Sequence, residues 1–136
     1  MEDINLILGQ VLDKEQMDKY GEAVSFLRTP LPDRGAGDYH PYARDNVGYQ
    51  NFLSEVKTQI RFFMSRKRSS LYKQESELKI QAKDEKLAQA ERNAYCFSDP
   101  KYTAMSEEVE LYQLVHDRLD ALEWSLKSLL KSVVGK

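Results

Sequence analysis

A run of basic side chains in the middle of the sequence offers the clearest chemistry. Between Lys57 and Lys73 there are six basic residues and no acidic residue. On a helix, at about 100° per residue, one flank collects cations from this run and from the residues after it, together with a tyrosine. Cations beside an aromatic ring suit a phosphate backbone with stacked bases, a contact that does not read base sequence. The predicted nucleic-acid-binding residues on this flank are Lys57, Arg61, Arg68, Tyr72, Lys79, Lys83 and Lys86.

Two other interpretations of this flank stay open. It could be the solvated face of a polar helix, braced by pairs such as Lys73 with Glu77, or it could bind an acidic protein. Phe62 or Phe63 could add to base stacking. The acidic residues of the same helix gather on the opposite flank, so the charges are sorted by face. These acidic residues are Glu55, Glu77, Asp84 and Glu91.

Residues that could carry catalysis or bind metal are isolated from one another. The Gly35–Gly37 segment is not followed by the Lys-Ser/Thr of a phosphate-binding loop. His40 and His116 have no second His, Cys or carboxylate spaced to complete a metal site, and Cys96 is the only cysteine. The sequence therefore predicts a non-enzymatic protein without a metal or cofactor.

The basic flank requires a long helix to position it. From Asn46, a suitable cap, to about Tyr95 there is no proline, and after Gly48 there is no glycine. This stretch predicts one very long helix, or two helices joined near Ser69-Ser70. One face of it is apolar at helical spacing and is expected to be buried. This stripe consists of Leu53, Val56, Ile60, Met64, Leu71, Leu78 and Ala82.

The last quarter of the chain, from Met105 to Val134, has the spacing of a coiled-coil seam. Apolar residues recur there at alternating steps of three and four, so each helical turn places one on the same face. A helix with this pattern needs a helical partner. The seam residues are Tyr112, Val115, Leu119, Leu122, Leu126, Leu129 and Val133.

A second apolar edge runs beside the seam. It indicates a helix that touches two neighbours, its own long helix and another subunit, although packing within one chain is the alternative. Trp124 on this edge is expected to be buried. The edge comprises Leu111, Leu114, Trp124, Leu130 and Val134, and the residues predicted for homo-oligomerisation are the seam residues together with Leu130.

The remaining signals divide the chain into three parts. Residues 1–28 predict short helices, with Asp13 and Gln16 in capping-box positions, that pack on the core or dock on a neighbour. Residues 29–45 are a Pro/Gly-rich loop, and 46–136 are a long helical hairpin that turns at Asp99-Pro100. The expected fold is all-α and a single domain overall, with a heptad-patterned C-terminal helix, assembled into an oligomeric bundle or ring.

Composition limits the location and the class of the protein. The 136 residues carry a net charge of −2, so any nucleic-acid binding must come from local segregation of charge. No uninterrupted apolar stretch reaches the roughly 18 residues that suggest a membrane span. The expected location is the cytoplasm, with no membrane partner.

The turn and the helix after it resemble a known family. Arg92 stands three residues before Tyr95, the turn reads Asp99-Pro100-x-Tyr102, and Asp117-Arg118-Leu119-Asp120 lies in a Leu-rich helix. Over roughly residues 49–134 this arrangement resembles the T4-type phage recombination mediators of the UvsY family. The chain departs from the family at Ala90, where the family has a lysine, and at Ser98, where a glycine is usual.

The resemblance implies a function in DNA recombination and repair. The family is helical, forms ring-like oligomers and binds single-stranded DNA without sequence preference. It helps a recombinase load onto strands covered by single-strand-binding protein, so both proteins are implied partners. The implied DNA contacts lie on the helix from Lys79 to Arg92, which adds Arg92 to the predicted site. If the chain is phage-encoded, its location is the host cytoplasm. The alternative is a structural or adaptor helical oligomer, such as a virion component, with no nucleic-acid role.

Overall fold

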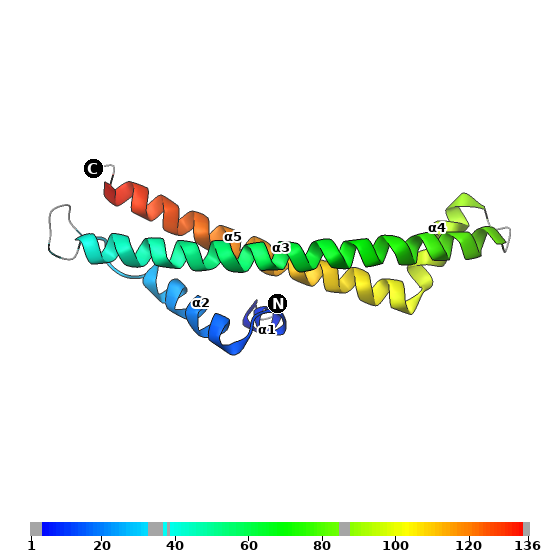
Figure 1. Cartoon of the computed structure of the whole chain (residues 1–136), viewed down its shortest axis with the longest axis horizontal. Coiled ribbons are helices and arrows are strands. Elements are labelled where there is room, and N and C mark those ends of the chain that lie inside the picture. The colour runs from blue at the N-terminus through cyan, green and yellow to red at the C-terminus, as the bar shows by residue number, and fades with distance from the viewer. Residues whose placement is uncertain (1–3, 33–36, 38, 85–87, 135–136) are drawn as a thin grey trace. The chain divides into compact units, whose positions relative to one another are not determined.

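The computed structural model describes residues 4–32, 37, 39–84 and 88–134. Within these ranges the backbone forms five helices and no strand, which confirms the predicted all-α fold. The helices are α1 (Ile4–Val11), α2 (Lys14–Phe26), α3 (Tyr39–Asp84), α4 (Gln89–Ser98) and α5 (Pro100–Val134), in the order shown in Figure 1. None of them, over the residues described, is both long and apolar enough to cross a membrane.

The chain forms two compact units, where the sequence pattern suggested a single domain. Unit 1 combines residues 1–59 with residues 115–136, and unit 2 consists of residues 60–114. Helices α3 and α5 each contribute to both units. Because α3 is continuous from Tyr39 to Asp84, the possible break at Ser69-Ser70 does not occur. The prediction that the long helix reaches about Tyr95 is wrong, because α3 ends at Asp84 and the separate helix α4 begins at Gln89. The Asp99-Pro100 turn therefore joins α4, rather than the long helix, to α5.

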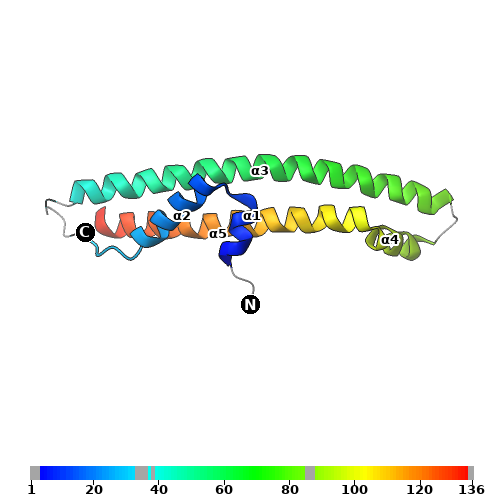
Figure 2. The same ribbon diagram turned by 90° about the horizontal axis from the view of Figure 1, so that it is seen from below.

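In unit 1, α3 and α5 pack antiparallel. Asn46 contacts Leu126, and Lys57 contacts Asp120, so residue numbers rise along α3 as they fall along α5. The two helices can be followed in Figure 2. A hydrogen bond of 3.1 Å from Arg118 Nε to the Tyr20 hydroxyl ties α2 to α5.

The start of α2 follows its sequence signal. The Asp13 side chain accepts a hydrogen bond from the Gln16 backbone N–H at 2.8 Å, and the Gln16 side chain accepts one from the Asp13 N–H at 3.1 Å. This is the predicted capping box. Leu8 and Leu12 near its start are buried, so the N-terminal helices pack on the core of their own chain.

Unit 2 is held by a small apolar cluster and a capped turn. Leu78, Cys96 and Tyr102 are buried together, and Cys96 is a free thiol. Helix α4 ends at Ser98 and α5 begins at Pro100. The Asp99 carboxylate accepts a hydrogen bond from the Tyr102 N–H at 2.9 Å, which confirms Asp99 as the predicted cap.

The predicted boundary of the Pro/Gly-rich loop is wrong. Helix α3 begins at Tyr39 rather than Asn46, so residues 39–45 of the predicted loop are helical. Pro41 lies in the first turn, where a missing N–H costs no helical hydrogen bond. Asn46 is therefore not a cap but a buried residue, whose side-chain amide donates to the Leu126 carbonyl at 3.0 Å.

The apolar stripe of α3 and the seam of α5 are buried as predicted. Every stripe residue is buried except Leu71, which is half-buried. In the seam, Tyr112 and Leu129 are half-buried and the other five residues are buried, three of them completely. The fully buried seam residues are Val115, Leu119 and Leu126.

Two predictions for α5 are wrong. The buried seam residues Val115, Leu119, Leu122, Leu126 and Val133 were predicted to join subunits, but their own chain already covers them. Leu130 beside the seam is half-buried. Trp124, predicted to be buried, is 71% exposed. The seam is thus used inside the chain, and an aromatic side chain stands outside it.

Replacing Asp99 tests the capped turn. Asp99→Ala should lower the free energy of unfolding by about 1 kcal/mol, because the α5 N-terminus loses a side-chain acceptor. Urea unfolding followed by circular dichroism measures the change. The control is Asp18→Ala, an exposed position within α2, which should not lower the free energy of unfolding, because alanine is the better helix former. Equal effects of the two variants would contradict the capping role.

Candidate nucleic-acid interface

The segment of α3 from Arg61 to Lys73 presents two rows of cations and aromatic rings. The face of α3 away from the buried stripe carries exposed Ser65 and Ser69 between the two rows. All six side chains of the rows are exposed. We call this the basic–aromatic surface: Arg61, Arg68 and Tyr72 in one row, and Phe62, Arg66 and Lys73 in the other.

The aromatic side chains of this surface are unusually accessible. Tyr72 is 71% exposed and Phe62 is 60% exposed. The Arg66 guanidinium carbon lies 5.7 Å from the centroid of the Phe62 ring, within the range of a cation–π contact. The neighbouring Phe63 ring instead turns toward Tyr112 of α5, with centroids 6.4 Å apart. Phe62 and Tyr72 are therefore the rings available to a ligand.

Arg68 has a neutral hydrogen-bond partner, so its positive charge can attract an external anion. Its guanidinium donates to the neutral side-chain oxygen of Gln113 at 3.0 Å, a contact that orients the group without neutralising it. Arg68, Tyr72 and Glu75 line a hollow with Leu71 and Val109. Tyr72 thus lies beside a cation at the edge of a shallow concavity.

Lys57 was predicted to belong to the basic flank, and this is wrong. It is only 6% exposed, because it lies at the margin of the apolar stripe and α5 covers it. Its ammonium group bonds Asp120 at 2.7 Å and also pairs with Glu123, which is itself buried. Burial lowers the pKa of Lys57, but its hydrogen bonds to these carboxylates outweigh that effect and leave the pKa above its ordinary value. Lys57 is a structural cation.

Carboxylates pair with two further lysines of α3. Lys79 bonds Glu75 one turn before it at 2.8 Å, and this hydrogen bond raises the pKa of Lys79. Lys67 pairs with Glu108 of α5 at 3.0 Å. Lys79 remains about half exposed and can reach a ligand, but the carboxylate of Glu75 weakens the attraction of Lys79 for a phosphate.

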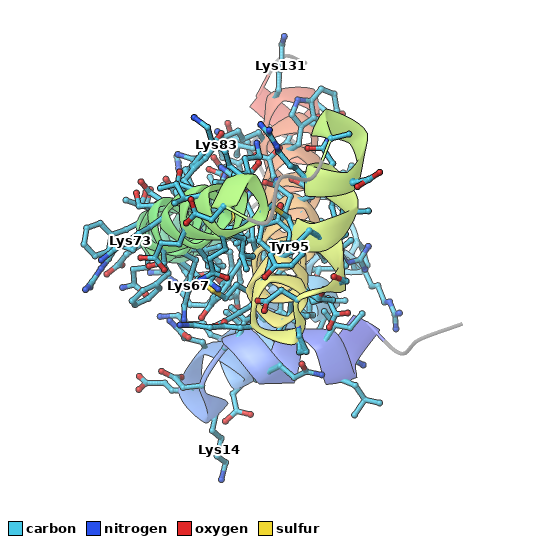
Figure 3. The ribbon with its side chains drawn as sticks, turned by 90° about the vertical axis from the view of Figure 1, so that its right-hand side faces the viewer. Lys14, Lys67, Lys73, Lys83, Tyr95 and Lys131 are labelled. Carbon is cyan, nitrogen blue, oxygen red and sulfur yellow. The ribbon has the colours of Figure 1, made fainter. Side chains whose placement is uncertain are left out.

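The last predicted residues lie near the end of α3 and on α4. Lys83 is exposed in the last turn of α3, and Lys86 lies outside the described residues. Arg92 is half-buried on α4. The Tyr95 hydroxyl contacts the Gln81 side chain at 3.4 Å, which links α4 to α3. Figure 3 shows Lys67, Lys73 and Lys83 on α3 and Tyr95 on α4.

Three residues of the basic–aromatic surface were not among the predicted flank residues: Arg66 and Lys73 were not assigned to the site, and Phe62 was predicted only as a possible addition to base stacking. They lie on the other side of α3 from the predicted flank, and a prediction based on that flank alone leaves them out. The signal was present in the sequence, since all three fall in the acid-free run between Lys57 and Lys73. Exposure of both sides of this segment brings them into the site.

The described residues contain no group of three or more His, Cys, Asp or Glu side chains that could hold a metal ion. His116 contacts the neighbouring Asp117 at 3.3 Å. The cations of the basic–aromatic surface suit a polyanion, and its aromatic rings can stack on other flat rings such as bases.

No protein-family model, curated protein or solved structure was found to match this chain. What the chain does is therefore inferred from its own residues.

Replacing Lys57 tests its structural role. Lys57→Met should lower the free energy of unfolding by about 3 kcal/mol, because the buried Glu123 carboxylate loses its main cation. The double variant Lys57→Met/Glu123→Met should recover most of the loss. Lys67→Met, which breaks an ion pair with a partly exposed side chain at each end, should cost about 1 kcal/mol or less. Chemical unfolding measures all three, and equal losses for Lys57 and Lys67 would contradict the buried pair.

Proposed function

We propose that this protein binds single-stranded DNA without sequence preference, through the basic–aromatic surface of α3. It acts as a non-enzymatic accessory protein of DNA recombination. The observation that carries the proposal is the exposure of Phe62 and Tyr72 among arginines and a lysine, in a run of α3 that has no acidic residue.

The cations supply affinity for the phosphate backbone. Arg61, Arg66, Arg68 and Lys73 are exposed on this segment. Each phosphate contact releases counterions, and this release favours binding at low salt. Contacts of this type fix the position of a strand but carry no base information, so binding is independent of sequence.

The aromatic rings favour a single strand over a duplex. Phe62 and Tyr72 are ten residues apart in a continuous helix, a rise of about 15 Å. Unpaired bases can leave the strand axis and stack on such rings, whereas bases inside a duplex have no free face. A helix face that is only solvated has no use for exposed aromatic rings, so Phe62 and Tyr72 favour binding over the solvated-face interpretation.

The wider role follows from the resemblance to UvsY-type mediators. In that role the protein binds single-stranded DNA and helps a recombinase load onto strands that single-strand-binding protein already covers. Lys83 and Arg92 lie beyond the basic–aromatic surface and extend the DNA path toward α4 in this proposal.

The salt dependence of binding tests the cation contacts. The triple variant Arg61→Ala/Arg66→Ala/Lys73→Ala should flatten the slope of log K against log salt concentration by roughly 2, since three phosphate contacts are lost. Fluorescence anisotropy of a labelled single-stranded oligonucleotide at several salt concentrations measures the slope. The matched control removes three exposed cations of unit 1, Lys14→Ala/Arg28→Ala/Arg44→Ala, and should keep the wild-type slope. No binding by the wild-type protein at low salt would favour the structural or adaptor role instead.

Substitution of Tyr72 tests base stacking. Tyr72→Ala should weaken binding of the oligonucleotide by about 1–3 kcal/mol, while Tyr72→Phe should bind like the wild type because the ring is kept. Phe97→Ala removes a comparably exposed ring that lies on α4, outside the basic–aromatic surface; it is the control and should weaken binding less than Tyr72→Ala. Wild-type affinity in Tyr72→Ala would exclude stacking on this ring.

A further inference from the structure

Trp124 marks a surface of α5 that the chain itself does not cover. It is the only tryptophan in the sequence, and 71% of it is exposed. Its neighbour Glu123 and the nearby Leu126 face the interior of unit 1, so the helix cannot bury Trp124 by turning. A large aromatic side chain on a regular helix, outside the buried seam, is the type of residue that dominates protein interfaces.

The helix surface around Trp124 permits close approach of another helix. Ala121, Ser125 and Ser128 lie on the same side of α5 and are exposed. The Ser125 hydroxyl donates to the Ala121 carbonyl at 3.0 Å, so it can be covered without losing its hydrogen bond. Because these side chains are small, an indole ring from a second molecule has room to pack against the helix here.

Charges are ordered along this same side of α5. Asp117 lies seven residues before Trp124 and Lys131 seven residues after it, about two turns in each direction. Asp120 and Lys127 repeat this order closer to Trp124, although within the chain Asp120 also pairs with Lys57 and Lys127 with Glu123. All four side chains are exposed. Lys131 projects away from the helix in Figure 3. The surface is acidic before Trp124 and basic after it.

We infer that this surface binds a second copy of the chain, with the two α5 helices antiparallel and a two-fold axis near Trp124. A two-fold interface must be complementary to itself. In the antiparallel arrangement Asp117 faces the partner's Lys131, and Lys131 faces the partner's Asp117. A parallel arrangement would place like charges opposite each other. The order of charges therefore selects a second copy and its orientation.

This dimer surface includes Trp124 of the second apolar edge, but none of the seam residues that the sequence suggested for oligomerisation. Val115, Leu119 and Leu126 are completely buried within one chain and cannot reach another. The inference concerns assembly and does not depend on the proposed binding of DNA.

The test uses the full-length chain without DNA. Sedimentation velocity over a range of concentrations should show a reversible monomer–dimer equilibrium. The fluorescence maximum of Trp124 should shift to shorter wavelength as the dimer forms, because the indole leaves water. Trp124→Ala should weaken dimerisation roughly 30-fold or more, as expected for a central aromatic anchor. Phe97→Ala, equally accessible on α4, is the control and should dimerise like the wild type.

Charge reversal tests the orientation. Asp117→Lys and Lys131→Asp should each weaken the dimer, and the double variant Asp117→Lys/Lys131→Asp should restore it, because opposite charges again meet across the axis. A mixture of the two single variants should form a heterodimer. A chain that stays monomeric at high concentration, or a dimer unaffected by Trp124→Ala, would overturn the inference. A double variant weaker than both single variants would overturn the antiparallel orientation.

Discussion

The buried ion pair between Lys57 and Glu123 fixes how α3 lies on α5 in unit 1. Removing an ammonium and a carboxylate from water is costly, and the cost is offset only when the two groups meet. A shift of α3 along α5 by one turn would leave both charges buried without each other. The bond from Asn46 to the Leu126 carbonyl imposes the same requirement about three turns earlier on α3. The apolar seam supplies the driving force for packing, and these polar contacts select one register.

Once the register is fixed, the distance of each cation from the buried stripe decides its role. Lys57 lies at the margin of the stripe, so the partner helix covers it and it becomes structural. Arg61 and Lys73 lie further around α3 and remain in solvent. Because each length of a long helix has few neighbours, much of its circumference stays exposed. The basic–aromatic surface of α3 and the Trp124 surface of α5 are both of this kind.

The uses proposed for these two surfaces are complementary. A single basic–aromatic surface offers few phosphate contacts, and so few contacts supply little affinity at physiological salt. In the proposed dimer, pairing two chains through Trp124 would join two such surfaces in one particle, and a linked second site acts at a high effective concentration. The proposed assembly and the proposed DNA binding therefore involve different residues of the chain and would support the same function.

The sequence alone determined the features that depend on local periodicity and local hydrogen bonding. The all-α class, the buried stripe, the seam of α5, the capping box at Asp13 and the turn at Asp99-Pro100 were all predicted in this way. It placed the start of α3 too late, because a proline in a first helical turn resembles a proline in a loop. It also could not tell that the seam is covered by its own chain, that Lys57 is buried or that Trp124 is exposed. Periodicity shows which residues share a face of a helix, but only the tertiary structure decides which faces meet, since that depends on residues distant in the chain.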